Sequence, residues 1–298
     1  MTGANRGLGL VLAEVLAGRG AAVVLACRDP AGGDQARRQV LSRCPGATVD
    51  VVALDLADPD SVAAAAATLR GRGEPIHLLV NNAAAILPPA GRTTDGIEVA
   101  FATNHLGHFA LTGRLLPDLA SGARVVTMSS MLHRVGRLDR DDLVGSVTRD
   151  PPLGPWRAYA RSKFANLVFT AELQRRIDAS GDDVAAVAAH PGHATTHADS
   201  SRPDASWLRP LRPLLDRLGQ TAAEAVLPAL RAGVDPEVRG GTFYGPAASG
   251  ERRGPPVEVG LPRRAADPVL GIRLWEASEQ LTGVSYPIVG RRSVGGLN

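Results

Sequence analysis

The sequence predicts an α/β fold in which a doubly wound parallel sheet carries helices on both faces. Short apolar runs alternate along the chain with longer stretches of helical periodicity, and this alternation is typical of parallel strands joined by right-handed crossovers. The runs are almost continuously apolar, as strands buried on both faces must be. The chain has 298 residues, of which 44% are hydrophobic, and this is enough to build one large core in a single domain.

The predicted elements follow one another with few interruptions. Strands are expected at Ala21–Cys27, Val49–Leu54, Ile76–Asn81, Arg124–Ser129, Val184–His190 and Thr242–Tyr244. Helices are expected at Leu8–Arg19, Gly33–Arg43, Pro59–Arg70, Asp95–Leu119, Trp156–Ser180 and Thr221–Ala232, and at 266–282 with Gly283 as the cap. Residues 131–157 carry prolines among charged residues and are predicted to form a long loop.

Residues 1–298 are expected to form a single domain with two additions. The first is an apolar insertion at 193–219, which contains Trp207 and several leucines. It is interpreted either as a lid over an apolar substrate or as a packed surface excursion. The second is a C-terminal extension at 247–298, whose Gly-, Pro- and Arg-rich part at 247–264 is expected to be irregular.

Composition argues against several classes of partner. The net charge is +3 and the basic residues alternate with acidic ones, so no nucleic-acid partner is expected. No apolar run approaches the roughly 20 residues that cross a bilayer, and no signal peptide is recognised at the N-terminus. Cys27 and Cys44 are interpreted as free thiols. These observations predict a cytoplasmic protein without a membrane span.

No metal site is predicted, although the chain is not poor in histidine. None of the candidate ligands shows metal-binding spacing with acids or cysteines. They are His105, His108, His133, His190, His193 and His197.

A glycine-rich turn precedes the first predicted helix. Thr2–Gly9 reads TGANRGLG, and glycines at this spacing let the backbone approach a pyrophosphate at a helix N-terminus. The residues expected to contact the phosphates are Gly3, Asn5, Arg6, Gly7, Leu8 and Gly9. Such a turn ordinarily follows a strand, yet only Met1 precedes Thr2. We therefore expect that the first strand is missing and that the native protein begins further upstream.

The charges at this edge indicate which dinucleotide binds. The strand Ala21–Cys27 ends at Arg28, where an acidic residue would hold a ribose diol and an arginine suits a 2′-phosphate. Arg6 supplies a second cation. The pair predicts NADP(H) in preference to NAD(H).

Lys163 is singled out by composition before any motif is considered. Of the 33 Lys and Arg residues it is the only lysine, and a site that needs a compact, titratable ammonium group cannot use arginine. Tyr159 lies four residues earlier, one helical turn away on the same face. A nearby ammonium favours the phenolate and makes a tyrosine better able to exchange protons. Ser130, at the end of a predicted strand, could hold a substrate carbonyl beside Tyr159.

These motifs, in this order, resemble the short-chain dehydrogenase/reductase family, and in particular its retinol-dehydrogenase-like branch. The resemblance rests on the Thr2–Gly9 turn, Asp55-Leu56, Asn81-Asn82-Ala83, Asn104 within NHLGHF, Ser129-Ser130, YARSK at Tyr159–Lys163, Pro191-Gly192 with Thr196, and the tail motifs at Arg273–Glu276 and Leu281–Gly283. The chain departs from the family at Ala84, where the family has glycine.

The resemblance implies a Rossmann-like NAD(P)-binding fold and a role for each matching residue. Tyr159 would be the general acid/base, Lys163 would bind the nicotinamide ribose and lower the Tyr159 pKa, and Ser130 would orient the substrate. Asn104 would hold a water in the proton relay to Lys163. The adenosine part would meet Asp55, Leu56, Asn82 and Ala83, and the nicotinamide end or phosphates would meet Pro191, Gly192 and Thr196.

The function expected from these residues is an NADP(H)-dependent interconversion of a carbonyl and an alcohol on a small lipophilic substrate. Two alternatives stay open: a non-catalytic NADP(H)-binding sensor or scaffold, and a reductase of a C=C bond. A homodimer through the helices at Asp95–Leu119 and Trp156–Ser180 is expected from the family, whereas the C-terminal tail is expected to block larger assemblies.

Overall fold

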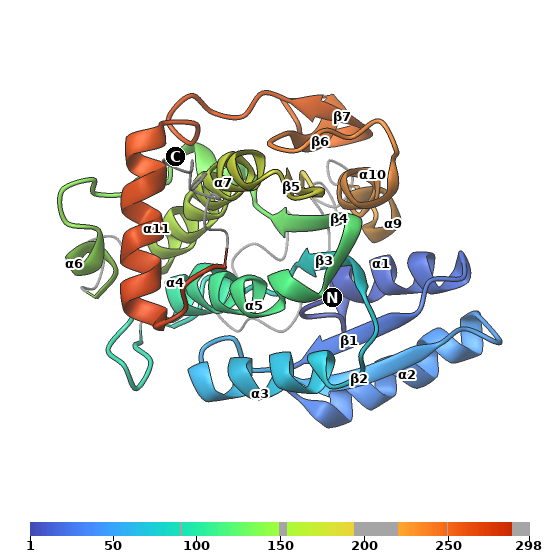
Figure 1. Ribbon diagram of the computed structural model, residues 1–298. Coiled ribbons are helices and arrows are strands. Elements are labelled where there is room, and N and C mark those ends of the chain that lie inside the picture. Colours follow the sequence, from blue (N-terminus) through green and yellow to red (C-terminus); the bar gives the residue numbers. More distant parts are fainter. Residues whose placement is uncertain (90, 149–153, 194–219, 249, 288–298) are drawn as a thin grey trace, which may run out of the picture.

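The computed structural model describes residues 1–89, 91–148, 154–193, 220–248 and 250–287. Within these residues a mostly parallel sheet lies between two layers of helices (Figure 1). The prediction of a doubly wound parallel sheet in a single domain is confirmed. Strands β1 (Val23–Cys27) and β2 (Val49–Ala53) pair in parallel. The second group runs in the order β3 (Ile76–Asn81), β4 (Leu119–Met128), β5 (Val184–Ala189), β6 (Phe243–Ala248) and β7 (Arg253–Val259).

Met1 and Thr2 occupy the position between β1 and β3. The backbone N–H of Thr2 donates to the carbonyl of Val80 at 3.0 Å, and the carbonyl of Met1 accepts from Ala26 at 2.9 Å. Thr2 also forms a parallel bridge with Ala26. The two groups of strands therefore meet at these residues, immediately before the glycine-rich turn.

The helices divide between the two faces of the sheet. On one face, α1 (Gly7–Gly18) contacts α2 (Pro30–Arg43) and α9 (Ala222–Ala225), while α10 (Leu227–Val234) packs on β4, β5 and β6. On the other face, α3 (Pro59–Arg70) contacts α5 (Gly107–Leu115), and α7 (Pro155–Ser180) packs on β4 and β5 (Figure 1).

The last helix, α11 (Pro268–Thr282), lies across α7 and α5 rather than on the sheet (Figure 1, red). Its Trp275 joins a buried aromatic cluster with Phe109 of α5, Phe169 of α7 and Tyr286. The Tyr286 hydroxyl donates to the carbonyl of Phe109 at 2.6 Å. Helix α11 thus covers part of the surface that α5 and α7 would otherwise expose.

The prediction of one continuous helix over Asp95–Leu119 is wrong. Helix α4 (Val99–Phe101) starts only after Glu98, whose carboxylate accepts from the backbone N–H groups of Ala100 and Phe101. A π-helical turn (Ala102–Leu106) and α5 follow, and the remainder is a 3-10 turn (Leu116–Asp118) leading directly into β4.

Three other predicted segments need correction. The predicted helix Thr221–Ala232 is divided into α9 and α10, and Pro228 lies in the first turn of the second helix. The loop at 131–157 contains a 3-10 helix (Met131–Arg134) and α6 (Leu143–Thr148). The expectation that 247–264 is irregular is wrong for residues 253–259, which form β7 and pair antiparallel with β6. The prolines of β7 are tolerated because β7 is an edge strand. The insertion at 193–219 lies outside the described residues except for His193.

Candidate active site

Tyr159 and Lys163 lie one turn apart on α7, against the carboxyl end of β4. The Nζ of Lys163 donates to the carbonyl of Met128 at 3.0 Å and lies 5.8 Å from the centre of the Tyr159 ring. Both side chains are buried, at 2% and 7% exposure. A second residue, Asn166, donates to the same Met128 carbonyl at 3.0 Å, so the end of β4 fixes this face of α7.

Burial shifts the pKa values of the pair in opposite directions. It lowers the pKa of Lys163 to about 7, because an ammonium loses its hydration in the interior. It raises the pKa of Tyr159 to about 12, while a side-chain hydrogen bond with Ser130 acts against that rise. At neutral pH the phenol of Tyr159 is therefore protonated, and Lys163 is present both as the charged ammonium and as the neutral amine. The expected lowering of the Tyr159 pKa by Lys163 stays a prediction.

Ser130 lies where the strand β4 gives way to the short helix Met131–Arg134. Its Oγ accepts from the backbone N–H of Leu132 at 3.3 Å and so caps that helix. Its side chain also acts on the Tyr159 hydroxyl, whose pKa it lowers against the effect of burial. The neighbouring Ser129 faces the other way, with its Oγ donating to the carbonyl of Lys163 at 2.9 Å. The two serines thus have different partners: Ser129 bonds to α7, whereas Ser130 caps the helix Met131–Arg134 and acts on Tyr159.

Asn104 lies in the π-helical turn and is fully buried. Its amide Nδ2 donates to the Oγ of Ser162 at 2.9 Å, and its Oδ1 accepts from the backbone N–H of Ala85 at 2.7 Å. These contacts tie the turn to α7 next to Lys163 and to the loop after β3. π-helical turns are rare in proteins, and those that occur are often found at functional sites. The residue predicted to hold the relay water therefore lies in a backbone conformation that is itself typical of such sites.

His108 was not among the predicted site residues, yet it connects the relay position to the glycine-rich turn. Its Nδ1 lies 3.0 Å from the carbonyl oxygen of Asn104, and its Nε2 lies 2.8 Å from the Oγ1 of Thr2. A carbonyl can only accept, so Nδ1 carries the hydrogen and Nε2 accepts from Thr2. Burial lowers the pKa of His108 to about 3, which agrees with a neutral ring. The available sequence signal was its spacing of four residues from Asn104.

The glycine-rich turn packs directly on the loop after β3. A Cβ on Gly3 would lie 2.7 Å from the Cα of Ala83, and a Cβ on Gly9 would overlap the carbonyl of Gly3. Asn82 donates through Nδ2 to the carbonyl of Thr2 at 2.9 Å. These glycines are therefore needed for close packing between the predicted phosphate and ribose segments.

Open space remains where the phosphates are expected. Gly7, the first residue of α1, has a φ of +57°, and nothing lies within 4 Å of a Cβ built on it. Backbone N–H groups at the start of a helix bind anions. With Asn5, Arg6 and Leu8 around it, this turn fits a dinucleotide pyrophosphate.

Arg6 and Arg28 lie at the same edge as this turn, and both are exposed. Asp29, next to Arg28, caps α2 by accepting from the backbone N–H of Ala31 at 3.0 Å. Within the described ranges no ion pair involves Arg6 or Arg28. The carboxylate of Asp29 thus caps α2, and the guanidinium groups of Arg6 and Arg28 remain available to an anion.

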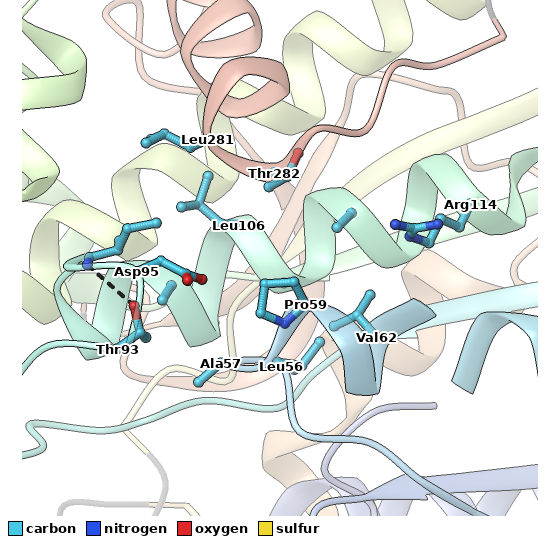
Figure 2. A pocket seen from close by; sticks show the side chains of 14 residues that line it. Leu56, Ala57, Pro59, Val62, Thr93, Asp95, Leu106, Arg114, Leu281 and Thr282 are labelled. Carbon is cyan, nitrogen blue, oxygen red and sulfur yellow. Dashed lines mark hydrogen bonds between the residues drawn. The ribbon is translucent and has the colours of Figure 1, made fainter. Parts of the chain in front are cut away.

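Asp55 and Leu56 follow β2, as predicted. Asp55 accepts through Oδ1 from the backbone N–H of Ala57 at 3.0 Å. Leu56 is buried and lines a hollow between α3, α5 and the end of α11, of about 430 Å³ including open solvent. Figure 2 shows this hollow, with Asp95 at one end and Arg114 at the other. It contains none of the predicted catalytic side chains, so it is separate from the corner around Lys163.

Pro191 and Gly192 follow β5, with Gly192 at a φ of +67°. Its backbone N–H donates to the Nδ1 of His190 at 3.2 Å. Thr196, the third residue predicted here, lies outside the described residues. The structure therefore brings Ser130, Tyr159, Lys163 and Asn104 together, with the dinucleotide residues along the carboxyl edge of the sheet.

Comparison with known proteins agrees with this geometry. The family model described as short chain dehydrogenase matches residues 1–139. Mouse retinol dehydrogenase 12 is 34% identical over 293 residues, which cover 96% of this chain and 86% of the relative. The chain belongs to the short-chain dehydrogenase/reductase family. The resemblance to its retinol-dehydrogenase-like branch is likewise confirmed.

Solved structures of the family extend the comparison to the fold. A crystal structure of an uncharacterised protein from Mycobacterium paratuberculosis is 41% identical with a TM-score of 0.75, covering 96% of this chain and 93% of that one. A short-chain dehydrogenase from Burkholderia cenocepacia, solved in complex with NADP, is 25% identical with a TM-score of 0.60, covering 81% of this chain and 92% of that one. No helix in the described part of the chain is long and apolar enough to span a bilayer.

Proposed function

We propose that this chain is an NADP(H)-dependent oxidoreductase that interconverts a carbonyl and an alcohol on a small lipophilic substrate, with Tyr159 as the general acid/base. The observation that carries the proposal is the buried corner at the end of β4. There Ser130 and Lys163 both lie beside Tyr159: Ser130 acts on the Tyr159 hydroxyl and lowers its pKa, and the Nζ of Lys163 lies 5.8 Å from the centre of its ring. A protein that only bound a nucleotide would not need this proton-exchanging set.

The protonation states favour carbonyl reduction in the neutral pH range. Ser130 would hold the substrate oxygen, and the protonated phenol of Tyr159 would donate its hydrogen to that oxygen as negative charge develops on it. The proton lost from Tyr159 is replaced through Lys163 and the relay at Asn104. Bound NADPH would supply the hydride that completes the alcohol. Oxidation of the alcohol uses the same groups in reverse.

Two observations support NADP(H) as the cofactor. Arg6 and Arg28 are exposed at the edge of the glycine-rich turn, with Asp29 engaged in capping α2. An arginine at this place suits the 2′-phosphate of NADP(H). The Burkholderia cenocepacia relative was solved with NADP. Position 28 itself carries an arginine in place of the acidic residue that would hold the ribose diol of NAD(H).

A lipophilic substrate is supported by apolar side chains exposed near the catalytic groups. Val135 is 67% exposed and follows the helix that Ser130 caps, while Trp156 is 60% exposed and precedes Tyr159 by one turn. Ile86, next to the residue bound by Asn104, is 50% exposed. Contiguous exposed apolar patches often mark binding sites, and these three side chains would border such a patch. The lid role of residues 193–219, the cytoplasmic location and the homodimer stay predictions.

The test is a pair of measurements on the wild-type chain and Tyr159→Phe. Titration with NADPH and NADH, followed by nicotinamide fluorescence, is expected to show tighter binding of NADPH by both proteins. Turnover of lipophilic aldehydes and ketones should fall by a factor of about a hundred to ten thousand in Tyr159→Phe. Binding without turnover of any carbonyl or activated alkene would favour the sensor alternative. Turnover of alkenes alone would favour C=C reduction, and the absence of binding would contradict the proposal.

A further inference from the structure

The turn between β6 and β7 touches both loops that border the proposed active site. Arg134, which ends the helix capped by Ser130, donates through Nη1 and Nη2 to the carbonyl of Gly250 at 3.3 Å. On the other side, the backbone N–H of His193 donates to the carbonyl of Arg252 at 2.8 Å. Three segments distant in sequence therefore meet at this turn.

Glu251 bridges the two loops with its carboxylate. Its Oε1 lies 2.8 Å from the Nη2 of Arg134, and its Oε2 lies 3.0 Å from the Nε2 of His190. The His190 side chain is fully buried, whereas that of Glu251 is 28% exposed. Each carboxylate oxygen thus serves one loop, and loss of the carboxylate would release both loops at once.

His190 connects Glu251 to the Pro191–Gly192 loop. Its Nδ1 accepts from the backbone N–H of Gly192 at 3.2 Å, so the hydrogen of the neutral ring is on Nε2 and is donated to Glu251. Gly245 leaves the space that the ring needs, because a Cβ there would lie 2.2 Å from Nε2. The imidazole is therefore held in one orientation between the hairpin and the loop.

The backbone of Glu251 is unfavourable for any residue with a side chain. Glu251 and Gly250 both have a φ of +68°, in the left-handed region that glycine enters most easily. Tight turns between antiparallel strands favour glycine or asparagine in this conformation. A glycine would suit position 251 better, so the glutamate is present despite a backbone cost. Such an outlier points to a role for the side chain.

We infer that Glu251 is a positioning residue, which sets the distance between Ser130 and the Pro191–Gly192 loop. Since Ser130 is proposed to hold the substrate carbonyl and the loop to hold the nicotinamide end, Glu251 would align the two reacting partners. This inference rests on the proposed function. Hydride transfer is sensitive to such alignment, and a displacement of about 1 Å can cost roughly a hundredfold in rate.

The test compares Glu251→Gly and Glu251→Gln with a matched control, Glu258→Gln, on the same hairpin. Glu258 lies only 3.9 Å from the exposed Arg239, so its loss should leave all parameters unchanged. Glycine removes the carboxylate and relieves the backbone. Glutamine keeps the size of the side chain but cannot accept from both Arg134 and His190, because its NH₂ group must face one of these donors. Thermal unfolding, KM and kcat for NADPH and a carbonyl substrate, and the deuterium isotope effect on hydride transfer are measured.

We expect Glu251→Gly to unfold at or above the wild-type temperature while its kcat falls by about tenfold or more. Its substrate KM should change little, and the isotope effect on kcat should increase because hydride transfer becomes limiting. Glu251→Gln should lie between the two proteins. A merely structural role would instead lower the unfolding temperature of both variants and leave the isotope effect unchanged.

The inference is overturned if kcat of Glu251→Gln stays within about twofold of the wild type, even where Glu251→Gly does not fold. An active wild type with unaffected variants contradicts the inference alone. A wild type that neither binds NADPH nor turns over a carbonyl removes the proposed function and the inference together.

Discussion

Lys163 is the only lysine of the chain, and it is buried to 2% exposure although lysine is rarely buried in proteins. Its ammonium donates to a backbone carbonyl, that of Met128, and among the described residues no carboxylate forms an ion pair with it. Burial therefore lowers its pKa to about 7. Arginine could not take this place and remain able to titrate. The lysine can thus change its charge in the pH range in which the enzyme is proposed to work.

This pKa predicts the pH dependence of carbonyl reduction. The charged form of Lys163 is present below a pH of about 7 and is lost above it, whereas the phenol of Tyr159 stays protonated up to about 12. If the ammonium supports proton donation by Tyr159, kcat/KM for reduction should fall as the pH rises through about 7. Lys163→Arg should have a lower rate but no descending limb near neutrality. A wild-type profile that is flat from pH 6 to about 9 would contradict this role of Lys163.

Arg28 gives a second prediction for a single residue, concerning cofactor choice. Arg28→Ala should weaken NADPH binding by about tenfold, because one charge-assisted contact to the 2′-phosphate is lost. NADH binding should change little. Arg38→Ala, at another exposed arginine on the following helix, serves as the control in the same fluorescence titration. Equal losses for NADPH and NADH would assign Arg28 to a general role in folding or electrostatics.

At the scale of elements, the π-helical turn Ala102–Leu106 links the glycine-rich turn to the catalytic helix. His108 accepts from Thr2 on one side and donates to the carbonyl of Asn104 on the other. Asn104 in turn donates to Ser162 of α7. A substitution at His108 should therefore change both the free energy of unfolding and the rate of proton transfer through Asn104.

His108→Phe should leave the carbonyl of Asn104 and the hydroxyl of Thr2 without their buried partner. The expected cost is about 1–3 kcal/mol in the free energy of unfolding, measured with urea. The kcat of carbonyl reduction should fall at the same time. His108→Gln, which can both donate and accept, should recover part of each loss. Unchanged stability in His108→Phe would mean that water replaces the imidazole.

The sequence predicted those elements whose signals are local. Pro59–Arg70 and Ile76–Asn81 were placed with their observed bounds, because a capping Asp58 and a continuous apolar run are visible without tertiary contacts. The strand β7 was missed because Pro255 and Pro256 argue against a strand unless it is known to lie at an edge. The π-helical turn was missed because it has no periodicity distinct from that of an α-helix.

In the candidate site too, the residues with a local sequence signal were predicted and those that depend on tertiary contacts were not. Tyr159 and Lys163 were recognisable from their spacing, since both belong to one helix. The carboxylate that joins Arg134 and His190 was not, because Glu251 lies 61 residues from His190 and farther from Arg134. No short-range pattern connects residues that only the sheet order brings together. The sequence predicted the reacting groups, and the structure was needed to find the residues that hold them.

At the scale of the whole molecule, α11 covers part of the outer side of α5 and α7. Trp275 stacks on Phe169 and contacts Phe109 and Tyr286, and the guanidinium of Arg176 lies 4.3 Å from its ring centre. A homodimer through α5 and α7 would have to form around or displace this helix. Light scattering tests the predicted homodimer: a mass of one chain, 31.0 kDa, would mean that α11 prevents pairing through α5 and α7, and a mass of two chains would confirm a dimer.

The stability that α11 contributes can be measured with two tryptophan variants of opposite exposure. Trp275 is 2% exposed and Trp156 is 60% exposed. Trp275→Ala should lower the free energy of unfolding by about 3–5 kcal/mol, because it removes the centre of the aromatic cluster and leaves a cavity. Trp156→Ala should change it by no more than about 0.5 kcal/mol. Since the cluster joins α11 to α5 and α7, Trp275→Ala should also expose their apolar faces and promote self-association in light scattering. Equal, small effects of the two variants would show that α11 contributes little to the fold and that the surface beneath it is open to a partner.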